Sequence, residues 1–132
     1  MKVVDSTFLI SLLRNEASTV RKAEELDEEG GAATTVINIY ETMYGVFRSM
    51  NMQNKRLDSL KRIIVNLDVL DLNYEAACKA AEIAGTLGRE GRGIDPFDSL
   101  IAGITLTYGA EALITRNTTH FERIPGLLIE TH

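Results

Sequence analysis

The chain has 132 residues and a mass of 14.6 kDa, so residues 1–132 are expected to form one domain. Apolar residues make up 45% of the chain and charged residues 25%, a composition that excludes intrinsic disorder. One cysteine and two histidines exclude an internal disulfide and a cysteine-rich or histidine-rich metal site. The formal net charge of −5 is opposite to that of a protein that holds nucleic acid by bulk charge.

The N-terminal segment meets an acid at Asp5 instead of extending into a secretory signal, and no stretch approaches the ~18 apolar residues of a membrane span. The lone cysteine, Cys78, fits a reducing compartment. We therefore expect a cytoplasmic protein without membrane association.

The expected elements alternate between strand and helix along the chain. Strands are predicted at 2–5, 32–35, 67–72, 112–115 and 127–129, and helices at 8–13, 17–29, 36–50, 53–66, from Asn73 onward, and 95–108. Proline at position 96 after an aspartate is a typical helix start. This order, with short connections, predicts an α/β fold: a three-layer α/β/α sandwich with a mainly parallel central sheet.

Two of these helices carry patterns that predict their packing face. An apolar stripe at helical spacing is expected to face the core: Val36, Tyr40, Met43, Phe47 and Met50. In the helix that Asn73 caps, small residues share a face suited to close packing: Ala77, Cys78, Ala81, Ala84 and Gly85. Residues 36–66 also hold more apolar side chains than one small core readily buries, which predicts a two-fold homodimer through this region: Tyr40, Met43, Tyr44, Val46, Phe47, Met50 and Met52.

Acidic residues are expected to gather at the edge where the carboxyl ends of parallel strands meet. Asp5 follows the first strand, and Asp95 and Asp98 begin a helix at that edge. Glu41 lies in a helix rich in apolar residues, where a carboxylate is costly unless it is paired or binds a cation. Each acid alone is also explained as a helix cap or a helix-surface residue. Together they would repel one another, which favours a cation site, and oxygen ligands suit Mg²⁺ or Mn²⁺.

Rival motifs are absent from the sequence. There is neither a G-x-x-x-x-G-K-[ST] phosphate loop nor a G-x-G-x-x-G turn after a strand. His120 is interpreted as a loop residue or a substrate contact. Residues 44–62 contain one acid, Asp58, and a set of basic residues that indicates either phosphate contacts or a solvated helix face: Arg48, Lys55, Arg56, Lys61 and Arg62.

Four features, in this order and spacing, resemble the PIN-domain nucleases of the VapC toxin type. They are VVDSTFLI at 3–10, the isolated Glu41, IDPFDSLIAG at 94–103 and LITRNTTHFERIPGL at 113–127. The resemblance implies that Asp5, Glu41 and Asp98 are catalytic, metal-binding acids and that Asp95 is an added ligand or only a cap. It implies supporting roles for Thr7, Thr115 and Asn117, the last of which stands where many PIN domains carry a fourth aspartate. Arg116 is predicted to contact substrate.

The resemblance also implies an activity, which is Mg²⁺-dependent hydrolysis of RNA phosphodiester bonds by an activated water. The most specific expectation is the toxin of a toxin–antitoxin pair, inhibited by a small antitoxin protein. Two alternatives stay open: a housekeeping PIN ribonuclease in RNA processing, and a catalytically inactive PIN-like interaction module.

Overall fold

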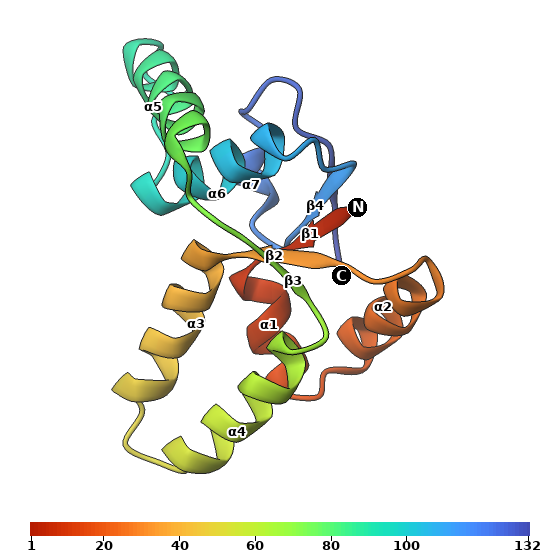
Figure 1. Cartoon of the computed structure of the whole chain (residues 1–132). Helices are drawn as coiled ribbons and strands as arrows, with labels where there is room; N and C mark the ends of the chain where they lie inside the picture. Colours follow the sequence, from red (N-terminus) through yellow and green to blue (C-terminus); the bar gives the residue numbers. More distant parts are fainter.

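The computed structural model describes residues 1–132 as a five-stranded sheet with seven helices (Figure 1). The strands are β1 (Lys2–Val4), β2 (Ala33–Thr35), β3 (Asp68–Leu70), β4 (Ala112–Ile114) and β5 (Ile129–Glu130). The helices are α1 (Ser6–Leu13), α2 (Ala17–Glu28), α3 (Val36–Arg48), α4 (Gln53–Ile64), α5 (Tyr74–Arg89), α6 (Pro96–Thr107) and α7 (Thr118–Phe121). The strand order is β3-β2-β1-β4-β5 and every neighbouring pair is parallel. The predicted α/β sandwich is confirmed.

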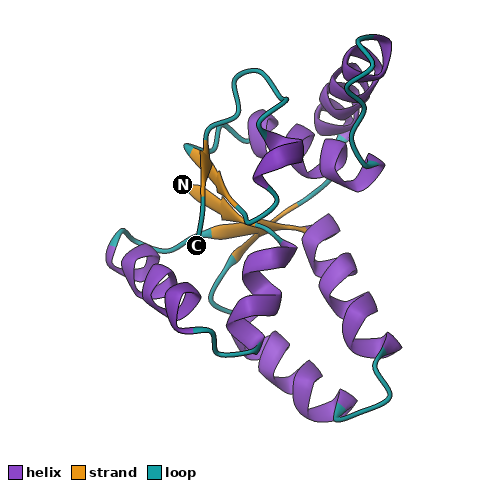
Figure 2. Ribbon diagram, turned by 180° about the vertical axis from the view of Figure 1, so that it is seen from behind, coloured by secondary structure: helices purple, strands orange, loops and turns teal.

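Helices cover both faces of the sheet, with α5, α6 and α7 on one side and α1 to α4 on the other (Figure 2). Adjacent residues of β1 point to opposite faces: Val3 joins the core beneath α5 and α6, and Val4 joins the core beneath α1 and α2. A strand buried on both faces reads as a continuous apolar run, which is why Val3-Val4 and Leu113-Ile114 are recognisable from sequence. None of the helices is long and apolar enough to cross a membrane.

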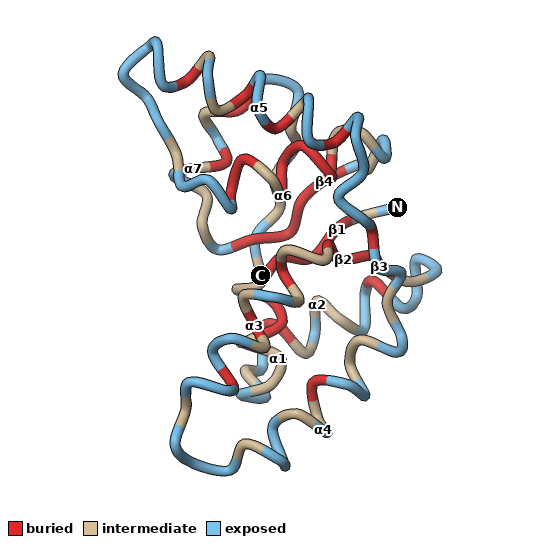
Figure 3. Tube along the Cα trace, turned by 60° about the vertical axis from the view of Figure 1, so that its left-hand side comes forward, coloured by how far each residue is buried: buried red, intermediate tan, exposed pale blue.

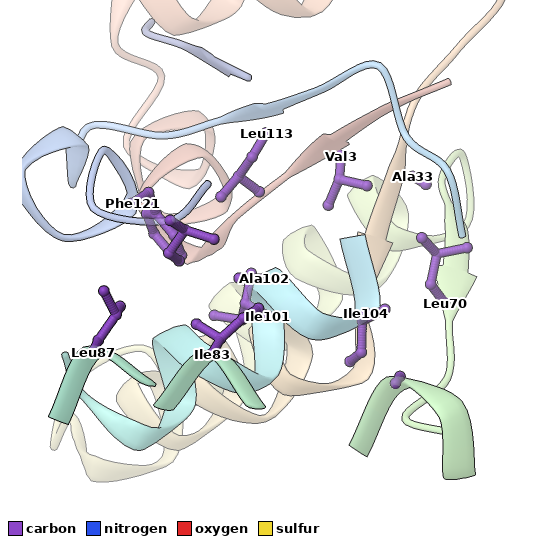
Figure 4. Close-up of a cluster of buried hydrophobic side chains, with 12 residues drawn as sticks. Val3, Ala33, Leu70, Ile83, Leu87, Ile101, Ala102, Ile104, Leu113 and Phe121 are labelled. Atoms are coloured by element: carbon purple, nitrogen blue, oxygen red, sulfur yellow. The ribbon is translucent and has the colours of Figure 1, made fainter. Parts of the chain in front are cut away.

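The larger core lies between the sheet and α6, where Ile101 and Ile104 pack against Val3 and Leu113 (Figure 4). Helix α5 covers α6 from outside at close range. A Cβ on Gly103 of α6 would lie only 2.7 Å from a side-chain or backbone atom of α5. Gly103 is therefore the residue that allows these two helices to approach.

The packing face of α5 differs from the sequence prediction. The side chains that pack inward are Ala76, Ala80, Ile83 and Leu87. Of the predicted small face, Ala77, Cys78, Ala81 and Gly85 are exposed and Ala84 is half-buried. Both faces carry small residues at helical spacing, so composition alone did not separate them, and Gly103 on the facing helix decides which one packs.

The apolar stripe predicted for α3 is wrong for most of its length, although Val36 packs against the larger core and Met43 is half-buried. Tyr40 is 57% exposed, Phe47 59% and Met50, which lies just beyond the helix, 93%, whereas the buried residues of α3 are Asn38, Thr42 and Val46. Most of α3 is exposed or half-buried (Figure 3). The inward face is polar because it meets the end of β1, where the carbonyl oxygen of Val4 accepts hydrogen bonds from Thr34 Oγ1 and Asn38 Nδ2.

Candidate active site

Asp5 lies directly after β1, at the carboxyl edge near the centre of the sheet, and is only 3% exposed. Its Oδ1 accepts hydrogen bonds from the Thr7 hydroxyl at 2.6 Å and from the backbone N–H of Phe8 at 3.2 Å, which caps α1. Its Oδ2 accepts from the Thr115 hydroxyl at 2.5 Å. Burial raises the pKa of the Asp5 carboxyl, and these hydrogen bonds oppose the rise. The donors are neutral, so they orient Asp5 without cancelling its charge.

Glu41 reaches the same edge from α3, where it is half-buried. The hydroxyl of Ser6 donates to Glu41 Oε1 at 2.7 Å, and Oε2 accepts no hydrogen bond. Burial raises the pKa of the Glu41 carboxyl, and the negative charges of Asp98, Asp5 and Asp95 raise it further. Glu41 is thus close enough to Asp98, Asp5 and Asp95 for their charges to act on it.

Asp98 is buried in the first turn of α6. Its Oδ2 accepts from Asn117 Nδ2 at 3.2 Å and from His120 Nδ1 at 2.7 Å, while Oδ1 accepts nothing. Both donors therefore fix the Asp98 carboxylate and leave one oxygen free. Sequence reasoning missed His120 as a partner of Asp98. The signal was its spacing, since His120 follows Asn117 by three residues and one helical turn brings both to one face.

Asp95 is exposed and is the N-cap of α6, where its Oδ1 accepts from the backbone N–H of Phe97 at 2.8 Å. Of the two roles expected for Asp95, the hydrogen bonds show that of a helix cap. The charge of Asp95 still acts on Glu41, so a cap and a contribution to the local negative charge coexist.

Thr7 and Thr115, which both donate to Asp5, also accept hydrogen bonds from the backbone that follows β4. Their hydroxyl oxygens accept the backbone N–H groups of Arg116 at 3.0 Å and Asn117 at 2.9 Å. Each hydroxyl therefore donates its hydrogen to Asp5 while its oxygen accepts a backbone hydrogen bond. The segment after β4 thus locks the two side chains that orient Asp5.

The guanidinium of Arg116 turns away from the acids. It forms an ion pair with Glu16 and donates to Ser18, Thr19 and the backbone oxygen of His132. A contact between Arg116 and substrate, as predicted from sequence, would require this network to open.

Sequence reasoning also missed Asn38 and Ser6, which connect the end of β1 to α3. The backbone N–H of Ser6 donates to Asn38 Oδ1 at 3.2 Å, and Ser6 in turn donates to Glu41. Asn38 is fully buried, and it sets the position of Glu41, one helical turn later on α3. The signal in the sequence was that Asn38, Thr42 and Val46 follow one another at intervals of four residues, as residues on one buried face of a helix do. The apolar stripe at other positions obscured this pattern.

The side chains fit a hard divalent cation by chemistry. All the acids offer oxygen atoms, Glu41 Oε2 and Asp98 Oδ1 are free, and no lysine or arginine forms an ion pair with them. No three His, Cys, Asp or Glu side chains are grouped closely enough to hold one ion. Binding of one ion by several of these acids would therefore require their side chains to move closer together.

Residues 2–127 match the PIN domain family. The chain belongs to the PIN domain family. A curated relative, the tRNA(fMet)-specific endonuclease VapC of Shigella flexneri, is 31% identical over 128 residues, which are 97% of this chain and 95% of the relative. The chain is therefore a PIN domain nuclease similar to VapC enzymes.

Solved structures support the same assignment of this PIN domain. The DNA-bound VapBC of Salmonella typhimurium has a TM-score of 0.86 and 29% identity, covering 98% of this chain and 96% of that chain. VapBC2 of Rickettsia felis, bound to a promoter DNA fragment, has a TM-score of 0.89 with 99% and 98% coverage. At 23% identity the latter shows the shared fold only.

Proposed function

We propose that this PIN domain nuclease is a Mg²⁺-dependent endoribonuclease that acts in the cytoplasm as the toxin of a toxin–antitoxin pair. The observation that carries the proposal is the gathering of acids around the half-buried Glu41: the negative charges of Asp98, Asp5 and Asp95 act on its carboxyl, and no lysine or arginine forms an ion pair with any of the four. Retaining several like charges at one edge is costly unless the site binds a cation. The relatives named as tRNA(fMet)-specific endonucleases and as a ribonuclease support RNA as the substrate.

Each acid has a distinct place in this proposal. Asp5, Glu41 and Asp98 would hold Mg²⁺, or Mn²⁺ in its place, and Asp95 would add an outer negative charge. When bound, the ion would supply an activated water and neutralise charge on the scissile phosphate. The chain's own residues pre-set the acids, because neutral hydroxyls orient Asp5 and two nitrogen donors orient Asp98.

Phosphate contacts are proposed for the basic residues of α3 and α4. Their side chains are exposed: Arg48, Lys55, Arg56, Lys61 and Arg62. Helices with exposed arginine and lysine provide electrostatic contacts to a nucleic-acid backbone despite the acidic net charge of the chain.

The decisive experiment is cleavage of a mixed RNA pool with Mg²⁺ or with EDTA. Asp5→Asn, Glu41→Gln and Asp98→Asn should each lower the cleavage rate about 100-fold or more while the protein still folds. Asp95→Asn should lower it less, because Asp95 is exposed and caps α6. The control is Glu82→Gln, an exposed acid on α5, which should cleave like wild type. Wild-type cleavage by Asp98→Asn, or full activity in EDTA, would reject the proposed site.

Two alternatives remain distinguishable from a toxin. A catalytically inactive PIN-like module would neither cleave RNA nor bind Mg²⁺. A housekeeping ribonuclease would cleave RNA but lack a cognate inhibitor. A short reading frame beside this gene that encodes a DNA-binding N-terminus, and whose product blocks cleavage, identifies the toxin.

An antitoxin partner is supported by the similar structures, which are VapBC complexes. The structure also has an apolar groove of about 440 Å³ between α1, α2 and α4, lined by Phe8, Leu12, Ala23, Leu26 and Ile63 among others. We propose that an apolar segment of the antitoxin binds there. Ala23→Glu, which places a charge in the groove, should weaken the complex and leave RNA cleavage unchanged, whereas an unaltered affinity would argue against this location.

A homodimer is proposed through the outward face of α3. Tyr40 and Tyr44 stack with ring centroids 6.2 Å apart, and Phe97 of α6 packs edge-on against Tyr40 at 5.6 Å. Together with Phe47 these rings form an exposed aromatic patch, which is typical of an interface. Light scattering at micromolar concentration should give twice 14.6 kDa, and Phe47→Glu should give the monomer mass. A wild-type monomer would refute the proposed dimer.

A further inference from the structure

His132 is connected to Asp5 through the hydroxyl of Thr7, although it is far from both residues in sequence. Strand β5 pairs with β4 and so brings the segment that follows it toward the carboxyl edge of the sheet. The imidazole packs edge-on against Phe8, with ring centroids 5.2 Å apart. Its Nε2 lies 3.2 Å from Thr7 Oγ1 and its Nδ1 lies 2.7 Å from Thr19 Oγ1. The ring therefore bridges α1, which begins at the site, to α2.

The direction of each hydrogen bond follows from counting hydrogens. Thr7 has one hydroxyl hydrogen, and the carboxylate of Asp5 can only accept, so Thr7 donates to Asp5. The Thr7 oxygen must then accept from His132 Nε2, as it accepts from the backbone N–H of Arg116. His132 consequently carries its proton on Nε2.

The other side of the imidazole completes the same pattern. With the proton on Nε2, a neutral ring has a lone pair on Nδ1, which accepts from the hydroxyl of Thr19. The Thr19 oxygen in turn accepts from Nη2 of Arg116 at 3.3 Å. One continuous chain of donors therefore runs from Arg116 through Thr19, His132 and Thr7 to Asp5.

The surroundings favour the neutral ring that this chain of hydrogen bonds requires. Burial and the positive charge of Arg116 lower the pKa of His132 to about 4, against an opposing effect of Glu16. A neutral imidazole with a fixed tautomer can donate to Thr7 and accept from Thr19 at the same time.

We propose that His132 is a positioning residue for Asp5: its Nε2–H holds the Thr7 hydroxyl so that Thr7 fixes the Asp5 carboxylate for the divalent cation. The inference rests on the proposed function, in which Asp5 is a metal-binding acid. A donor at the Thr7 oxygen also strengthens the bond that Thr7 donates, because hydrogen bonds in a chain polarise one another. Outer residues that orient a metal-binding side chain commonly change metal affinity or activity about 10- to 100-fold.

Three substitutions separate the hydrogen bonds of His132 from its packing. His132→Phe keeps a ring against Phe8 and removes both polar contacts. His132→Gln places an amide N–H near the position of Nε2, so it retains the donor to Thr7. His132→Asn places its amide near Nδ1, so it keeps an acceptor for Thr19 and loses the donor to Thr7.

The experiment measures three properties of the full chain: melting in EDTA, Mn²⁺ affinity by calorimetry, and kcat and KM for RNA cleavage. We expect His132→Phe and His132→Asn to bind Mn²⁺ about 10- to 100-fold more weakly and to lose kcat by a similar factor, with KM for RNA unchanged. His132→Gln should restore most of both properties. A merely structural role would instead follow melting, with Gln and Asn behaving alike.

The outcomes distinguish this inference from the proposed function. Wild-type Mn²⁺ affinity in both His132→Phe and His132→Asn overturns the positioning role and leaves the nuclease site intact. Equal losses in His132→Gln and His132→Asn also overturn it, even if His132→Phe fails to fold. If wild type binds no Mn²⁺ and cleaves no RNA, the proposed function fails, and the role of His132 toward a cation fails with it.

Discussion

Helix α3 brings Glu41 to the site and helix α6 brings Asp98, with Asp95 as its N-cap, yet the two helices pack differently against the sheet. Helix α6 packs Ile101 and Ile104 into the core. Helix α3 buries Asn38 and Thr42 and exposes Tyr40. The difference follows from their neighbours, because α6 lies over the side chains of the sheet, whereas α3 meets the end of β1 and its polar backbone. A helix beside strand ends must supply hydrogen bonds, and its apolar residues are then left for another surface.

The same contrast extends to the acids. Asp98 on α6 receives nitrogen donors from Asn117 and His120, so its charge is well supported. Glu41 on α3 receives one hydroxyl, from Ser6, and its pKa is raised first by burial and then by the negative charges of its acidic neighbours. The site thus has two halves. In the supported half, around Asp98, two side chains donate hydrogen bonds to the carboxylate. In the strained half, around Glu41, one hydroxyl donates and the neighbouring acids oppose the charge.

A large effect on stability is expected at the polar face of α3. Asn38→Leu should lower the free energy of unfolding by about 1–3 kcal/mol, because the backbone N–H of Ser6 loses its acceptor in a partly buried place. RNA cleavage should fall as well, since Ser6 would no longer be held to orient Glu41. The matched change on α6 is Thr105→Val, where the lost bond goes only to the helix carbonyl of Ile101, and it should cost less than about 1 kcal/mol. Urea unfolding measures both, and equal costs would remove the contrast between the helices.

A glycine in each helix sharpens the comparison. Gly103→Ala in α6 should destabilise by about 1–3 kcal/mol, because the added Cβ would press on the backbone of α5. Gly45→Ala in α3 has nothing within 4 Å and should stabilise by about 0.5–1 kcal/mol through helix propensity. Thermal melting of the two variants should therefore shift in opposite directions. A destabilising Gly45→Ala at dimer-forming concentration would place Gly45 in the interface between copies.

The order of strands and helices was predictable because its signals are local. Asp95-Pro96 and Asn73 begin helices at the expected residues, and the side chains of both caps accept backbone N–H bonds. Gly30 and Gly31 end α2 with φ of 106° and 103°, a region that other residues rarely adopt. The edge that collects the acids follows from parallel topology, so it too was predictable from sequence.

What sequence could not supply were partners that depend on the fold. His132 and Thr7 are 125 positions apart, and nothing near either residue predicts their contact. The partner of Asp98 was hidden for a related reason: the short helix α7 and α6 must first pack before His120 reaches the carboxylate. In α3 the apolar spacing was real, but spacing cannot say whether an apolar side meets the core or another molecule.

The smallest of these effects concerns the strained half of the site and depends on pH. The folded-state pKa of Glu41 is raised, so the native state binds more protons than the unfolded chain, and wild type loses stability as pH rises through the range between the two pKa values. Glu41→Gln lacks this loss, so in EDTA its melting temperature should exceed that of wild type at pH 7 and approach it near pH 4. The control is Asp98→Asn. Sequence alone suggests that it would relieve the same repulsion, but it also weakens the bonds from Asn117 and His120, so its gain should be smaller. Mg²⁺ should raise the melting temperature of wild type more than that of Glu41→Gln. An equal rise in melting temperature on adding Mg²⁺ to both proteins would show that Glu41 is an ordinary helix-surface acid. A difference between their melting temperatures in EDTA that does not depend on pH would show the same, and the two halves of the site would then be alike.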